Sequence, residues 1–262
     1  MQDGVLYVAE GPDYLTLAVA SAQSARAVMP DLNIDIFTDG TPPCGLFDRV
    51  HPIPQGLIRA KIECLPLSRF DRTLYLDCDT LVLQPFGDLF DILRRFALAL
   101  CHDMRRASDL IRQGHLEATP YAFPQMNGGV ILYRSGSQTA EFFAQWAQRY
   151  AAAGFERDQV TLKDLLWASD VPFYVLPPEF NLRRVTLLDA WEPLDARPTI
   201  VHSHRLLDHL RVQGAERVRD LAGVLALERV ALQQEWAAVN LRAADCPADE
   251  DPSLRFARAQ LR

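Results

Sequence analysis

The sequence has few cysteines, no concentrated block of basic residues and no long uninterrupted apolar run. Its five cysteines are odd in number and include no CxxC pair, so neither a zinc knuckle nor a disulfide framework is expected. They are Cys44, Cys64, Cys78, Cys101 and Cys246. Scattered thiols of this kind stay reduced in the cytosol, so the sequence predicts a cytoplasmic protein.

Charge and hydropathy exclude two further classes of protein. The net charge is −7 without a basic cluster, which argues against a nucleic-acid partner. No segment reaches the roughly 18 apolar residues that span a bilayer, so no transmembrane segment is expected. The first residues, Met1 to Val5, lack the basic and apolar regions of a signal peptide. What remains is an ordinary globular composition, and 262 residues suffice for one large α/β domain or two small ones.

Short apolar runs alternate with amphipathic segments along the first 205 residues. The runs at 5–9 and 34–37 predict buried strands, and the alanine-rich segment between them predicts a helix from Asp13, its N-cap, to about Met29. Such a strand–helix–strand unit is a parallel crossover. The sequence therefore predicts an α/β sheet that binds ligands at the carboxyl ends of its strands. Further helices are expected at about 57–70, 139–153 and 158–167, further strands at 73–76, 129–133, 171–175 and 199–201, and an irregular stretch at 101–125.

Beyond Arg205 the chain is almost wholly helical in character. Its apolar residues fall on roughly one stripe, formed by Val218, Leu221, Leu225, Val230 and Trp236. We interpret this segment as packed on the preceding domain, and a helix that forms a homodimer or lies on a membrane surface is the alternative. The chain thus divides into a domain at 1–205 and a helical C-terminal extension at 206–262.

Two carboxylates follow the apolar run that ends at Leu76. In an extended chain Asp77 and Asp79 point to the same side while Cys78 turns away. Their charges repel unless a cation lies between them, and a hard divalent ion with few protein ligands completes its shell with phosphate and water. The pattern predicts a metal–diphosphate site. Asp249 and Asp251 have the same spacing without an apolar run and are interpreted as a solvated turn.

Three other polar motifs lie beside expected strands or helices. Asn127-Gly128-Gly129 precedes a strand, either as a simple turn or as a place where a ligand approaches the backbone closely. Asp158 and Gln159 open a helix, where Asp158 is either an N-cap or a ligand of sugar hydroxyls. His202 ends the last strand and can complete an O,O,N metal site of the kind that suits Mn²⁺.

The order of these motifs resembles that of glycosyltransferase family 8, which includes glycogenin and bacterial lipopolysaccharide galactosyltransferases. The segment from Tyr75 to Val82, followed by Asn127 to Val130, carries most of a resemblance that covers about residues 5–205. It implies a GT-A nucleotide-sugar fold, with a mixed, mostly parallel sheet, and a retaining transfer from a UDP-sugar. It also implies that Asp77, Asp79 and His202 bind Mn²⁺, with Mg²⁺ as the alternative ion.

The resemblance also implies roles for individual residues around the donor. Tyr14 would stack near the uracil, and Lys61 and Arg59 would contact the donor. Asn127, Asp158 and Gln159 would line the reaction site. The expected donor-binding surface is completed by Ala9, Cys78, Gly128 and Gly129, although for the side chain of Cys78 we favour a small apolar filler.

One departure from the family marks the chain as a divergent member. Family members follow the metal histidine with a Gly-x-x-Lys-Pro-Trp segment, whose lysine holds the diphosphate. Here His202 is followed by Ser-His-Arg-Leu-Leu, and Arg205 is expected to replace the lysine. The resemblance therefore leaves open which hexose-type sugar is moved and whether the acceptor is a glycan, a lipid-linked glycan, a protein or a small molecule.

Retention can arise in two ways. Asp158 or Gln159 can act as nucleophile in a double displacement, or the acceptor can attack from the front face while the β-phosphate takes its proton. A glutamine amide is a feeble nucleophile, so we favour the front-face route. Two other functions stay open: a catalytically silent nucleotide-sugar binder and a haloacid-dehalogenase-like phosphatase, although Asp77 to Leu81 lacks one residue of the latter's motif.

Overall fold

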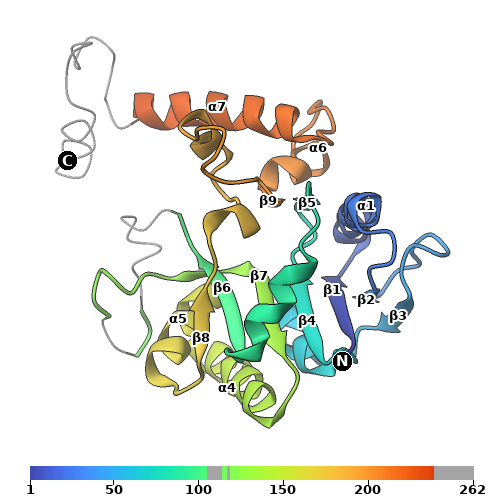
Figure 1. Ribbon diagram of the computed structural model, residues 1–262, viewed down its shortest axis with the longest axis vertical. Helices are drawn as coiled ribbons and strands as arrows, with labels where there is room; N and C mark the ends of the chain where they lie inside the picture. Colours follow the sequence, from blue (N-terminus) through green and yellow to red (C-terminus); the bar gives the residue numbers. More distant parts are fainter. Residues whose placement is uncertain (105–113, 117–118, 239–262) are drawn as a thin grey trace.

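The computed structural model describes residues 1–104, 114–116 and 119–238. Its centre is a seven-stranded sheet in the order β3-β2-β1-β4-β7-β6-β8 (Figure 1). In that order the strands are Arg49–Pro52, Ile34–Thr38, Asp3–Ala9, Arg72–Leu76, Met126–Arg134, Leu98–His102 and Phe173–Val175. Only β7 runs antiparallel to its two neighbours, β4 and β6, while the other neighbouring pairs are parallel. The expected mixed, mostly parallel α/β sheet is confirmed.

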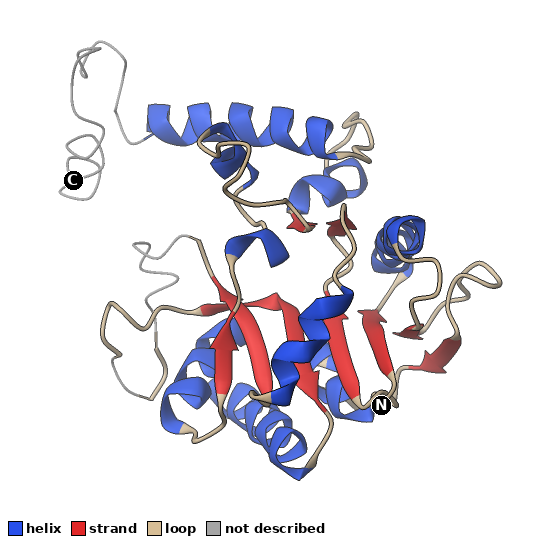
Figure 2. Ribbon diagram, in the orientation of Figure 1, coloured by secondary structure: helices blue, strands red, loops and turns tan. Residues whose placement is uncertain are grey.

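Alternate residues of the central strands face two separate layers of core. In β1, Val5, Tyr7 and Ala9 belong to the core on one face, with α1 (Pro12–Val28) and the 3₁₀ helix η2 (Gly87–Arg94). Leu6 and Val8 belong to the other face, with the helices α2 (Ala60–Cys64), α4 (Ser137–Ala153) and α5 (Asp158–Ala168). Helices therefore cover both faces (Figure 2), as expected when strands are apolar on both sides.

A second, two-stranded sheet carries the polar motifs. Its strands, β5 (Thr80–Val82) and β9 (Ile200–His202), are antiparallel, with Thr80 opposite His202. The turn formed by Asp77, Cys78 and Asp79 takes the chain from β4 in the large sheet into β5 in the small one. The expected strand at 199–201 thus exists one residue later, and it pairs with β5 instead of extending the main sheet.

The C-terminal part of the described chain is built from short helices and one long one. The 3₁₀ helices are η3 (Pro178–Phe180), η4 (Val185–Asp189) and η5 (His204–Leu207), and the α-helices are α6 (Asp208–Arg211) and α7 (Leu221–Ala238). Val224 of α7 is fully buried in the first core, and Glu228 accepts a 2.9 Å hydrogen bond from Ser203. The expected stripe is only partly right, because Val230 is 51% exposed. In the described part of the chain no helix is long and apolar enough to cross a membrane.

Several local expectations differ from the structure. The helix expected at 57–70 is reduced to α2 and the 3₁₀ helix η1 (Leu65–Leu67), because Pro66 lacks the N–H that would continue an α-helix. Gly11, not Asp13, is the N-cap of α1. Strand β6 extends into the stretch expected to be irregular, of which residues 105–113 and 117–118 lie outside the described chain.

The strand β3 is a further difference, since no strand was expected at 49–52.

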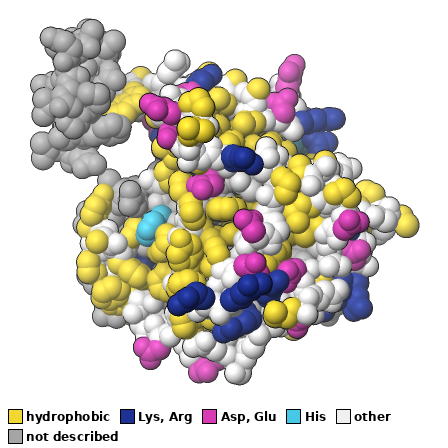
Figure 3. Space-filling view, in the orientation of Figure 1, with side chains coloured by type: hydrophobic (Ala, Val, Ile, Leu, Met, Phe, Trp, Pro, Cys, Tyr) yellow, Lys and Arg dark blue, Asp and Glu magenta, His cyan; other side chains and the backbone are white. Residues whose placement is uncertain are grey.

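Charged side chains of both signs are interspersed on the face shown in Figure 3. Arg72 forms ion pairs with Asp3 and with Asp91. This interspersion agrees with the absence of a basic block in the sequence.

Candidate active site

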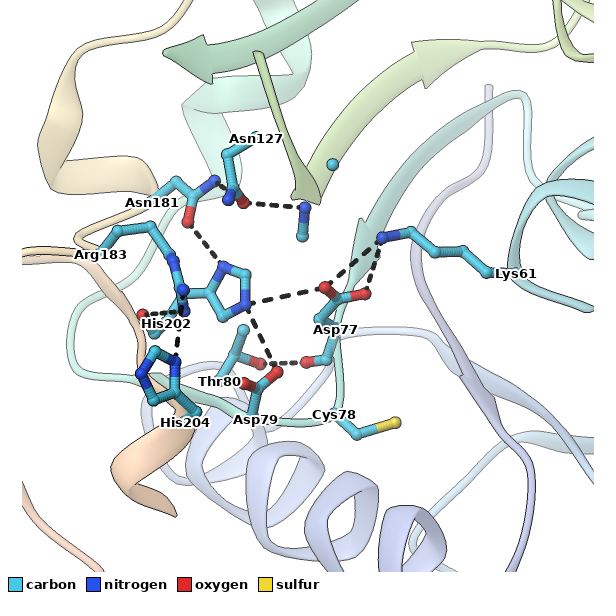
Figure 4. A network of polar contacts seen from close by, with 12 residues as sticks. Lys61, Asp77, Cys78, Asp79, Thr80, Asn127, Asn181, Arg183, His202 and His204 are labelled. Atoms are coloured by element: carbon cyan, nitrogen blue, oxygen red, sulfur yellow. Dashed lines mark hydrogen bonds and ion pairs between the residues drawn. The ribbon is translucent and has the colours of Figure 1, made fainter. Parts of the chain in front are cut away.

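Asp77, Asp79 and His202 converge where the two sheets meet. One ligand atom from each lies within 4.8 Å of the other two. The Nε2 atom of His202 is 3.6 Å from an Asp77 oxygen and 3.3 Å from an Asp79 oxygen (Figure 4). Cys78 points away from this group, although the segment is a turn and not the extended chain that led to this expectation. Burial would raise the pKa of Asp79, but His202 and Arg183 outweigh it, and that pKa is lowered.

A chain of hydrogen bonds determines which nitrogen of His202 is free to bind a metal. The backbone N–H of Gly129 donates to Asn127 Oδ1, so that atom is an acceptor. The Asn181 atom 3.0 Å from it must then be the donor Nδ2, which leaves Asn181 Oδ1 facing His202 Nδ1 at 2.9 Å. His202 therefore carries a hydrogen on Nδ1, and Nε2 is the nitrogen that faces the two carboxylates and would bind a metal. These three residues fit a divalent cation.

Gly129 is a glycine because the side chains of His202 and Asp77 lie against its backbone. A Cβ at this position would be 1.9 Å from His202 Cε1 and 2.8 Å from an Asp77 oxygen. The Asn-Gly-Gly motif lies within β7, not in a turn before it. At this point the pairing with β6 shifts register between Leu100 and Cys101, so the strand is irregular beside the site.

Lys61 and Tyr75 hold the carboxylate of Asp77. The Nζ atom of Lys61 is 3.1 Å from Asp77 Oδ1, and the Tyr75 hydroxyl donates to the same oxygen at 2.6 Å. Burial alone would lower the pKa of Lys61. The negative charges of Asp77 and Asp158 outweigh burial, so the pKa of Lys61 is raised above its ordinary value. Lys61 therefore brings a permanent positive charge beside the carboxylate cluster.

Asp158 is buried at the start of α5, but Arg157 is the N-cap residue and Asp158 pairs with Arg59 instead. The Arg59 guanidinium approaches one Asp158 oxygen at 3.0 and 3.1 Å. Burial would raise the pKa of Asp158, but Lys61 and Arg59 outweigh it and lower the pKa. The carboxylate is therefore ionised and engaged in an ion pair.

Gln159 belongs to a side-chain network with Asn127 and Asp103. Its oxygen accepts hydrogen bonds from Asn127 Nδ2 at 3.1 Å and from the Gly128 backbone at 3.4 Å. Its nitrogen donates to Asp103 at 3.1 Å. Neither Asp103 nor Asn181 was expected at the site from the sequence. Asp103 lies just beyond the end of β6, and a polar residue at a strand end is the signal that could have found it.

A cavity of about 800 Å³ opens beside the carboxylates. Of the residues expected at the donor, six line it: Tyr14, Arg59, Lys61, Asp77, Cys78 and Asp79. Val8 and Glu10 line the cavity, but Ala9 between them does not. Other expected site residues that do not line it are Asn127, Gly128, Gly129, Asp158, Gln159 and His202. Arg205 is also absent from the lining, and its guanidinium forms ion pairs with Asp208 at 3.3 Å and Glu228 at 3.4 Å. Arg211, for which no role was expected from the sequence, lines the cavity instead.

The match to a protein-family model decides what this arrangement belongs to. The model of the nucleotide-diphospho-sugar transferases matches residues 72–208, just over half of the chain, a range that includes β4, β5, β7 and β9 around the site. The chain belongs to this family. Within it, the protein is a member similar to glycosyltransferase family 8, with a GT-A fold. A search of curated proteins finds no match to this transferase.

Solved structures of glycosyltransferases share the fold of this family member. The galactosyltransferase LgtC, in complex with donor and acceptor sugar analogs, aligns with a TM-score of 0.58 at 17% identity over 90% of this chain and 99% of its own. GlyE of Streptococcus pneumoniae aligns with a TM-score of 0.57 at 18% identity, over 95% of this chain and 67% of its own. Mouse xyloside xylosyltransferase 1 aligns with a TM-score of 0.51 at 13% identity, over 76% of this chain and 97% of its own. Likeness at these identities establishes the fold.

Proposed function

We propose that this protein is a metal-dependent retaining glycosyltransferase that moves a hexose-type sugar from a UDP-sugar to an acceptor hydroxyl. The observation that carries the proposal is the convergence of Asp77, Asp79 and His202 at the edge of the cavity, with Lys61 beside them. The family membership supports a nucleotide-diphospho-sugar as donor. The acceptor belongs to one of the classes open from the sequence: glycan, lipid-linked glycan, protein or small molecule.

The ligand set favours Mn²⁺, with Mg²⁺ as the alternative. Two carboxylate oxygens and one imidazole nitrogen leave positions for diphosphate oxygens and water. A divalent ion held by these residues would neutralise the charge that develops on the departing diphosphate. The buried Asn181 supports this assignment, because it leaves Nε2 of His202 as the available ligand atom.

For the base, Tyr14 supports a uridine nucleotide. Its side chain is 42% exposed and lines the cavity at the start of α1. An exposed aromatic ring at the rim of a cavity offers a stacking face to a planar base. The choice of uracil rests on the family resemblance, so uridine diphosphate should bind better than guanosine diphosphate.

The contacts of Asp158 and Gln159 favour attack from the front face. Asp158 is paired with Arg59, and the oxygen of Gln159 already accepts two hydrogen bonds, which lowers its power as a nucleophile. We therefore assign Asp158, Gln159 and Asn127 to positioning the donor sugar in the reaction site. The acceptor hydroxyl then attacks on the side from which the diphosphate leaves, and a β-phosphate oxygen takes its proton.

Four further assignments complete the proposal. Residues 1–205 form the catalytic domain and 206–262 the helical extension. The protein is cytoplasmic, which the free thiols of Cys44, Cys64, Cys78 and Cys101 support. A homodimer through the extension is the assembly that the apolar stripe allows. Gly128 and Gly129 stay assigned to the donor-binding surface, although at Gly129 the side chains of His202 and Asp77 already occupy the space that a Cβ would take.

A screen of UDP-sugars with Mn²⁺ tests the function, with UDP release followed by NMR in the absence of acceptor. Slow hydrolysis of one donor by the parent and none by Asp79→Ala is the expected result. In calorimetry, Mn²⁺ should strengthen UDP binding to the parent and to Asp249→Ala, the matched change in the other Asp-x-Asp motif, but not to Asp79→Ala. Metal dependence that survives in Asp79→Ala would falsify the site. Donor binding without any UDP release identifies a silent binder, and GDP binding as well as UDP refutes the base assignment.

A further inference from the structure

Three Lys and Arg side chains line the cavity, and two of them are already paired with carboxylates. Lys61 contacts Asp77 at 3.1 Å, and Arg59 contacts Asp158 at 3.0 Å. The third, Arg211, donates from Nη2 to the neutral hydroxyl of Tyr14 at 2.9 Å. Among the described residues no carboxylate forms an ion pair with Arg211. Its charge is therefore available to a ligand in the cavity.

The charge balance of the site calls for such a cation. A nucleoside diphosphate carries about three negative charges at neutral pH, about one on the α-phosphate and up to two on the β-phosphate. Asp77 and Asp79 together cancel the charge of one divalent ion, and Lys61 is shared with Asp77. A guanidinium has five N–H donors in a planar fork, and only one of those of Arg211 is used by Tyr14. The remaining donors match phosphate oxygens.

Arg205 is not placed for this role. Its guanidinium lies between Asp208 and Glu228, at 3.3 and 3.4 Å, so two carboxylates already surround it. It does not line the cavity, whereas Arg211, at the end of α6, does. The contact with Glu228 ties Arg205 to α7. Its contacts are thus those of a residue that joins η5 to the C-terminal helix.

We propose that Arg211 binds the diphosphate of the nucleotide donor and that the hydroxyl of Tyr14 orients it, an inference that rests on the proposed function. Tyr14 then has two separable parts. Its ring serves the base, while its hydroxyl accepts the Arg211 hydrogen bond and holds the guanidinium at the rim. The segment after β9 supplies the phosphate-binding cation through a residue nine positions beyond His202.

Calorimetry with UDP and with uridine, both in the presence of Mn²⁺, tests the proposal. Arg211→Ala should weaken UDP binding by about 10- to 100-fold, the range for a charge-assisted hydrogen bond, and leave uridine unchanged. Arg211→Lys should restore part of the loss, because the charge returns without the planar fork. Tyr14→Phe keeps the stacking ring, so it should weaken UDP by a smaller factor and again leave uridine unchanged.

Arg217→Ala is the matched control for charge. Arg217 lies in the same segment but lines a different, smaller cavity, so its removal should leave UDP binding at the parent value. The proposal is overturned if Arg211→Ala binds UDP like the parent, if it loses uridine equally, or if only Arg205→Ala weakens UDP. The parent protein distinguishes failure of this proposal from failure of the proposed function. If the parent binds UDP, the outcomes above test only the role of Arg211. If the parent binds no UDP, both the role of Arg211 and the proposed function are overturned.

Discussion

Asn181 shows how a single buried amide orients the imidazole of His202 in the candidate metal site. It is 1% exposed, and its two polar atoms contact His202 and Asn127. Without the acceptor at Nδ1, the imidazole of His202 can carry its hydrogen on either nitrogen and can rotate. The cluster of Asp77, Asp79 and His202 would then lose its preorganised geometry. Asn181 is in this sense a positioning residue.

We therefore expect Asn181→Ala to weaken the enhancement of UDP binding by Mn²⁺ by about 10- to 100-fold, as outer-shell partners of metal ligands usually do. Asn181→Asp keeps an acceptor for Nδ1 and should retain most of the enhancement. Calorimetric titration of UDP with and without Mn²⁺ separates this effect from a simple loss of stability. Equal losses in the two variants would contradict the role of the acceptor.

Gly129 gives a second prediction at the scale of one residue. A methyl group there would overlap His202 and press on Asp77. Gly129→Ala should therefore lower the free energy of unfolding by about 1–3 kcal/mol, the usual cost of overpacking, and abolish the response of UDP binding to Mn²⁺. Gly136→Ala is the control, since its Cβ would meet no atom within 4 Å. Urea unfolding of both variants measures the difference, and equal stabilities would show that the close approach is absent.

At the scale of elements, the N-termini of α2 and α5 are joined by the pair Arg59 and Asp158. Burial of the Asp158 carboxylate is outweighed by Lys61 and Arg59, so its pKa is lower in the folded than in the unfolded protein, where it is about 3.9. The pair therefore stabilises the fold fully above the unfolded pKa. This contribution is lost as the pH falls through the folded pKa.

The free energy of unfolding of Asp158→Asn should consequently lie below that of the parent at pH 7, and the gap should narrow as the pH falls below about 4. Urea unfolding across this range measures the gap. The exposed Asp88→Asn variant serves as a control and should stay within about 0.5 kcal/mol of the parent. A gap that is independent of pH would mean that Asp158 contributes through packing and not through its charge.

At the scale of the whole molecule, the contacts of α7 bear on whether the proposed C-terminal extension unfolds together with the rest of the chain. Its contacts reach three earlier segments: Glu228 bonds Ser203, Arg229 pairs with Asp189, and Val224 is buried in the first core. Figure 1 shows α7 on the side of the small sheet, away from α4. Because of these contacts, we expect the described chain to unfold as one cooperative unit.

Val224→Ala should then lower the free energy of unfolding of the entire protein by about 2 kcal/mol, through two lost methyl groups and the cavity that remains. Val230→Ala on the same helix is the matched control, because Val230 is 51% exposed and its truncation should change stability by less than about 0.5 kcal/mol. A single urea transition that shifts only for Val224→Ala supports one unit. A separate early transition for α7 would place an independent unit at the expected boundary after residue 205.

Local pattern determined most of the elements and two of the three residues of the candidate metal cluster. The apolar run of β4 ends at Leu76, so Asp77 and Asp79 follow a strand end whatever the rest of the chain does. The helices α1, α4 and α5 follow from periodic apolar residues that need only a core to face. Apolar periodicity predicted a helix over 57–70, but Pro66 has no backbone N–H to continue it. The α-helix therefore ends at Cys64 and a short 3₁₀ helix follows.

Only the tertiary structure decided which polar atoms meet. His202 faces the carboxylates because β9 pairs with β5, an antiparallel register that no spacing along the chain encodes. Asn181 reaches His202, and Arg211 reaches Tyr14, across long separations in sequence. Sequence periodicity reports which side of an element is apolar, whereas hydrogen bonds and ion pairs depend on atoms brought within about 3 Å by the packing of distant segments. For that reason the sequence pointed to Arg205 as the nearest cation, and the fold brought Arg211 to the cavity instead.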